Sequence, residues 1–241
     1  MPSEIGAPLK ISRIAATGDS VARRWLELCL LMVIAFGGWL LSSVYFYRHG
    51  YSVFPLPYNE LLVFGICQEI VSLALLGYLL SRRNIRWRDL GLRWSIHDVL
   101  IGLLIALLCY GVYWSCYHSL LATHNSFFPF VPFTREPIAP YGPPPLMVIL
   151  FYLLNPFFEE LIVRAYLMRE VHALTGSWTL AAGLSTLLQA SYHIHYGWPV
   201  TISMGFQFLV CSIYYARKQR VTPLIITHGF FDISWWFLWL I

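Results

Sequence analysis

The sequence predicts an all-α fold, a polytopic membrane helical bundle of about seven transmembrane helices. Of the 241 residues, 58% are hydrophobic and 12% are charged, about half the charged share of a typical soluble domain. The mean hydropathy of +0.62 indicates the same class. The apolar residues also gather in segments of roughly 20 residues, the length that a helix needs to cross about 30 Å of hydrocarbon.

The predicted spans lie near residues 26–47, 59–81, 97–120, 146–170, 177–196, 198–216 and 221–241. Because short loops join them, we expect residues 1–241 to form a single transmembrane domain. The first span lacks a clear small-residue cleavage site, so we expect it to stay uncleaved. The proline-rich and aromatic segment 121–145 is expected to be a re-entrant or interfacial segment, which would make an eighth membrane element.

The basic residues predict how the chain is oriented. With the N-terminus inside, all but three of the sixteen Lys and Arg residues lie on the inner side. Arg48 and Arg135 lie outside, and Arg164 lies within a span. This bias predicts a cytoplasmic N-terminus and an external C-terminus, in what we expect to be a bacterial inner membrane. Since these residues flank apolar segments, the net charge of +4 is explained by topology, and we expect no nucleic-acid partner.

Charged residues inside the spans need partners. The fourth span reads NPFFEELIVRAYLMRE and contains Glu159, Glu160 and Arg164. A charge at mid-bilayer costs roughly 2.5–3.5 kcal/mol, so these residues and Asp232 would cost about 10 kcal/mol if unpaired. Glu160 and Arg164 are four residues apart and share a helix face, whereas Glu159 points about 100° away. The spacing therefore predicts a Glu160–Arg164 pair that leaves Glu159 free; the alternative is one structural ion-pair cluster.

Two later spans supply histidines. The fifth span ends QASYHIHYG, where His193 follows Gln189 by one turn on the same face. The seventh reads ITHGFFDISWW, where His228 and Asp232 are four apart and can contact each other. Each pattern is also compatible with an ordinary core histidine or a local helix pair. Because Glu159 and His193 are equally far in sequence from Gly176, the predicted turn capped by Ser177, we expect both at similar membrane depth.

This set of motifs resembles the CAAX prenyl protease and bacteriocin-processing (CPBP) family of glutamic-type intramembrane proteases. The family's EExxxR motif matches Glu159, Glu160 and Arg164, its second-motif histidine matches His193, and its HxxxN motif is matched in part by His228. The stretch RDLGLRW is also similar to the family's WxDLGL segment. The resemblance covers a family-like catalytic core at about 87–241.

The chain departs from the family pattern at three positions. Gln189 stands where an aromatic residue is common, Ala165 replaces the usual glycine, and Asp232 replaces the common asparagine. The third departure matters most, because an ionised carboxylate accepts hydrogen bonds but cannot donate one to an oxyanion.

The resemblance implies an endopeptidase that cleaves a membrane-anchored protein or peptide within the lipid bilayer and uses no cofactor. Glu159, aided by His193, would activate the attacking water. His228 would stabilise the oxyanion, with Asp232 orienting its ring or keeping it protonated. The implied supporting residues are Glu160, Arg164 and Gln189.

Three alternatives remain open. A zinc protease would use Glu159, His193 and His228 as ligands, although no HExxH motif is present. A transporter would use the buried charges as a substrate or proton path, although the sequence has neither inverted repeats nor paired broken helices; only Pro156 interrupts the fourth span. A non-catalytic scaffold would keep the fold, and Asp232 lends that alternative some support.

Overall fold

The structure is a computed structural model that describes residues 19–49, 58–123 and 146–238. These residues are helical and include no strand, which confirms the predicted all-α fold. The longer helices are α1 (Val21–His49), α2 (Tyr58–Arg82), α3 (Ile96–Ala122), α4 (Leu146–Glu159), α7 (Trp198–Lys218) and α8 (Thr222–Leu238). Shorter elements are η4 (Trp87–Leu90), η5 (Glu160–Leu167), α5 (Met168–Thr175), α6 (Trp178–Ser191) and η6 (Ile194–Tyr196).

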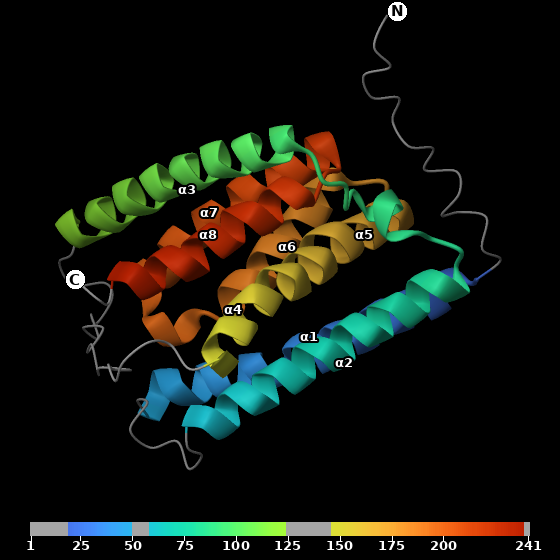
Figure 1. Cartoon of the computed structure of the whole chain (residues 1–241), viewed down its shortest axis with the longest axis horizontal. Helices are drawn as coiled ribbons and strands as arrows, with labels where there is room; N and C mark the ends of the chain where they lie inside the picture. Colours follow the sequence, from blue (N-terminus) through green and yellow to red (C-terminus); the bar gives the residue numbers. More distant parts are fainter. Residues whose placement is uncertain (1–18, 50–57, 124–145, 239–241) are drawn as a thin grey trace, which may run out of the picture.

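The helices form three groups that place the candidate site near the middle of the bundle. In Figure 1, α1 and α2 lie side by side below, and α3 lies above with α7 and α8. The continuous helix α4–η5–α5 and the hairpin partner α6 lie between these groups. Contacts between α2 and α4, between α4 and α8, and between α6 and α7 join the groups.

The membrane spans agree with the sequence prediction except at the fifth span, and the last residues of the predicted seventh span lie outside the described residues. Five stretches of the described chain are long and apolar enough to cross a membrane: Val21–His49, Leu62–Arg82, Ile96–Ala122, Leu146–Thr175 and Trp198–Lys218. Helix α6 has only 14 residues, or about 21 Å, and the described α8 has 17. The predicted fifth span is too long because the chain leaves the α-helix after Ser191. The predicted element 121–145 lies mostly outside the described residues.

The predicted hairpin turn after the fourth span is confirmed. Gly176 has φ +74°, a left-handed conformation that glycine adopts without steric cost, and its N–H donates to the His172 carbonyl. The hydroxyl of Ser177 then accepts a hydrogen bond from the N–H of Leu180 and caps α6. The α5–α6 hairpin therefore has a defined start, which fixes how α6 runs back along α5 and η5.

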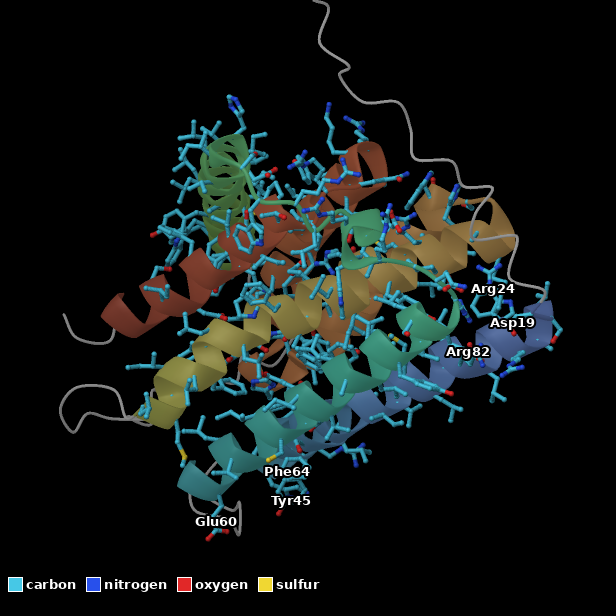
Figure 2. All side chains as sticks on the ribbon, turned by 45° about the vertical axis from the view of Figure 1, so that its right-hand side comes forward. Asp19, Arg24, Tyr45, Glu60, Phe64 and Arg82 are labelled. Carbon is cyan, nitrogen blue, oxygen red and sulfur yellow. The ribbon has the colours of Figure 1, made fainter. Side chains whose placement is uncertain are left out.

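An ionic cluster ties three helices together at one end of the bundle. The Glu170 carboxylate of α5 accepts hydrogen bonds from Arg24 of α1 at 3.0 Å and from Arg83, which follows α2, at 2.8 Å. Figure 2 shows Arg24, Asp19 and Arg82 gathered at this end, opposite Glu60. The predicted orientation makes this the cytoplasmic end.

This orientation can be tested with single cysteines in a variant from which the five native cysteines have been removed. Cysteines at Arg86 and Lys218, both exposed, are expected to escape an impermeant thiol reagent in intact cells. A cysteine at exposed Glu60 should react, because Glu60 lies at the opposite end. Permeabilised cells, in which all three should react, are the control. Labelling of Arg86 but not of Glu60 in intact cells would reverse the topology.

Candidate active site

The site begins where the fourth span changes its helical pitch. Pro156 lies inside α4 and has no N–H to donate to the helical ladder. Just beyond it the chain forms η5, a π-helical stretch in which every residue is buried. Such wider turns are rare and occur often at functional sites. Glu159 is the last residue of α4 and Glu160 the first of η5, so both carboxylates lie at this irregularity.

Glu159 is held by two neutral donors. Its side chain is almost fully buried, with 6% of the residue exposed. Its Oε2 accepts a hydrogen bond from Gln189 Nε2 at 2.6 Å and another from the hydroxyl of Tyr192 at 2.7 Å. Both bonds stabilise a negative charge on the carboxylate and fix its position.

Arg164 forms the centre of a supporting network. Its guanidinium donates to the hydroxyl of Ser185 at 2.9 Å and to the side-chain oxygen of Gln189. Its Nε lies 3.8 Å from Oε2 of Glu160, so the pair that the sequence spacing predicted is present. Gln189 therefore joins Arg164 to Glu159, since its oxygen accepts from one and its amide donates to the other.

His228 of α8 lies among the carboxylates. Its Nδ1 is 3.1 Å from Oε1 of Glu160, and its Nε2 is 3.7 Å from Asp232 and 4.0 Å from Oε2 of Glu159. The predicted His228–Asp232 contact within α8 is thus present. Asn155 contacts both members, because its Nδ2 lies 3.4 Å from Nε2 of His228 and 3.4 Å from Asp232.

His193 lies beside this group without a hydrogen bond to Glu159. The chain has left α6 by this point, and the His193 Nδ1 donates to the Gln189 carbonyl at 2.7 Å. This bond leaves Nε2 as the other ring nitrogen available to a ligand. The ring lies 5.3 Å from that of Phe208 and interacts electrostatically with Glu159 and His228. The structure therefore brings together the site residues that were predicted from the sequence, and His193 lies at the edge of this group.

Four polar residues of this site were not predicted from the sequence, namely Asn155, Tyr192, Ser185 and Glu69. Glu69 had the clearest signal, because it is an ionisable residue in the middle of the second span. Asn155 is a polar residue directly before Pro156 in a span. Tyr192 and Ser185 have no distinctive signal, since their bonds depend on how α6 packs against the fourth span.

No metal-binding cluster is found in residues 19–49, 58–123 and 146–238, where no three His, Cys, Asp or Glu side chains are arranged to hold an ion. Two histidines and a carboxylate are a sound zinc set in chemical terms, and zinc-bound histidines also commonly donate the other ring N–H to a carbonyl oxygen, as the His193 Nδ1 does here.

The fold and site thus define a helical membrane protein with a buried group of carboxylates and histidines. The family model described as type II CAAX prenyl endopeptidase Rce1-like matches residues 141–234. This match confirms the resemblance to CAAX proteases and supports a CAAX-type intramembrane endopeptidase in general. The matched stretch contains every site residue that the sequence motifs singled out. No curated protein and no solved structure matches the chain.

Proposed function

We propose that the protein cleaves a peptide bond of a membrane-associated protein or peptide, with water activated by Glu159 and a histidine. The observation that supports this most directly is the 4.0 Å gap between Glu159 Oε2 and His228 Nε2. The gap is too long for a direct hydrogen bond and suits one bridging water or a substrate oxygen. A carboxylate from α4 and an imidazole from α8 thus face the same position, which lies between them.

In the proposed reaction Glu159 is the general base. Its carboxylate takes a proton from the water as the oxygen attacks the scissile carbonyl carbon, and it later passes that proton to the leaving amine. The bonds from Gln189 and Tyr192 keep the carboxylate in place during both transfers. His193 assists from the edge of the site, where its ring interacts electrostatically with Glu159.

His228 is the proposed oxyanion stabiliser. Glu160 and Asp232 lie on either side of its ring, and these carboxylates stabilise a positive charge on the imidazole. A charged N–H donor then faces the oxygen on which negative charge develops. Asp232 fills the family's asparagine position as an acceptor, and its carboxylate also accepts a hydrogen bond from the amide Nδ2 of Asn155.

The proposed substrate is anchored in the membrane, because Glu159 lies within Leu146–Thr175, a helical stretch that is long and apolar enough to cross a membrane. The matched family is named for endopeptidases of CAAX prenyl proteins, and a membrane-anchored protein or peptide is the corresponding substrate class here. We propose that the reaction needs no cofactor and that zinc is not required. The chain would act in a bacterial inner membrane.

The test compares peptide termini in membrane fractions from cells with and without the gene. A new N-terminus or C-terminus in a membrane-anchored protein is expected only where the protein is present, and a chelator should not abolish its formation. Loss of the product with a chelator and its return with zinc would instead identify a zinc protease. The absence of any new terminus would favour a transporter or a scaffold.

A further inference from the structure

Glu69 of α2 is a carboxyl group without a hydrogen-bond partner inside the bundle. It is 0% exposed, and neither of its side-chain oxygens has a partner among the described residues. Its neighbour Gln68 donates to the Ala35 carbonyl of α1 at 2.7 Å, and Ser72 donates to the Gln68 carbonyl. These two polar neighbours along α2 are therefore hydrogen-bonded, whereas Glu69 is not.

The groups that face Glu69 belong to the site described above. Its carboxyl interacts electrostatically with Glu159 of α4 and with Asp232 and His228 of α8. The other helix packed against α2 is α1, which has no charged residue between Glu27 and Arg48. Within α2 itself, Glu60 and Arg82 at the two ends are the only other charged residues. Neither α1 nor the rest of α2 thus supplies a nearby cation.

The balance of charges in the site decides whether Glu69 is protonated. Four carboxyl groups meet two cationic side chains here, and the cations are Arg164 and His228. Glu160 lies against both cations, and Asp232 lies against His228. Glu159 is stabilised by its two donors. Glu69 has no donor, and its electrostatic neighbours are two carboxylates, Glu159 and Asp232, against the single cation His228. It is therefore the costliest of the four to ionise, so the excess proton belongs on Glu69.

We infer that Glu69 is a further positioning residue of the site, a neutral carboxylic acid whose proton keeps the negative charge on Glu159. Its catalytic consequence rests on the proposed function. Ionisation of Glu69 would add a fourth carboxylate charge to the site, and this charge would oppose the negative charge that develops on the oxyanion. Activity should therefore fall at alkaline pH as Glu69 loses its proton.

Infrared difference spectroscopy tests the protonation state without any need for activity. At neutral pH the spectrum of the wild type minus Glu69→Gln should contain the carbonyl band of a protonated carboxylic acid. Glu60→Gln, the same change at an exposed position of the same helix, should leave that band in place. Glu159→Gln should shift the band, since Glu69 would lose a charged neighbour. If Glu69→Gln folds poorly, Glu69→Asp can be used instead. This variant keeps a carboxylic acid, so it should shift the frequency of the band.

The pH profile of cleavage then tests the positioning role. Glu69→Gln should stay active at alkaline pH where the wild type has lost most of its rate, and Glu60→Gln should follow the wild type. A difference spectrum with only an ionised carboxylate, a band insensitive to Glu159→Gln, or identical pH profiles would each overturn the inference. If no variant or wild-type protein cleaves anything while the band behaves as expected, the proposed function fails and the protonated state of Glu69 stands.

Discussion

Glu159→Gln is expected to lower the cleavage rate by about 10²–10⁴-fold, the usual contribution of a general base. Glutamine has nearly the same shape, and its side-chain oxygen still accepts from Gln189 and Tyr192, so the network should survive. It cannot take a proton from water at neutral pH. The measurement is the single-turnover rate on a membrane-anchored substrate, with protein yield and thermal unfolding recorded in parallel.

The control is Glu60→Gln, which makes the same chemical change at an exposed position away from the site. It should cleave at the wild-type rate. A near-normal rate for Glu159→Gln, in protein that is folded and equally abundant, would refute the assignment of Glu159 as the base. A loss of yield instead of rate would mean that the residue is structural.

Arg164→Leu is expected to reduce the yield of folded protein severely. The guanidinium is fully buried, binds Ser185 and Gln189, and pairs with Glu160. Removing one partner of a buried ion pair typically costs about 3–5 kcal/mol, a large part of the roughly 5–15 kcal/mol that stabilises a domain. The measurement is the amount of monodisperse protein extracted from membranes, together with its unfolding temperature.

Arg217→Leu is the matched control, because Arg217 is exposed near the end of α7. It should leave the yield close to that of the wild type. Arg164→Lys keeps the charge but loses the planar fork, so an intermediate yield is expected. An Arg164→Leu protein as stable as the wild type would mean that His228, which also contacts Glu160, compensates the carboxylate without help.

Local spacing predicted those parts of the site that lie within one helix. The separation of four residues determines the Glu160–Arg164 and His228–Asp232 pairs, and both are present. The turn at Gly176 could also be predicted, because a glycine before a serine cap ends one helix and begins the next. Such features depend on the backbone geometry of a single segment of the chain.

Contacts between helices could not be predicted in this way. The early end of α6 brings the hydroxyl of Tyr192 to Glu159, whereas the predicted longer span would have continued through that position. Gln189 appeared to be a departure from the family pattern, but it links Arg164 to Glu159. Side-chain partners on separate helices depend on how those helices pack, and the sequence of one helix does not specify that.

The sequence by itself determined the membrane-embedded helical class and the motifs that carry the site, because hydropathy and spacing are properties of single segments. Only the tertiary structure decided which helices surround Glu159. It placed α8 so that His228 lies 4.0 Å from that carboxylate, and it buried Glu69 of α2 within electrostatic range of the same group. The physical reason is that burial and charge balance are set by the whole bundle, since each carboxyl group gains or loses partners from helices distant in sequence.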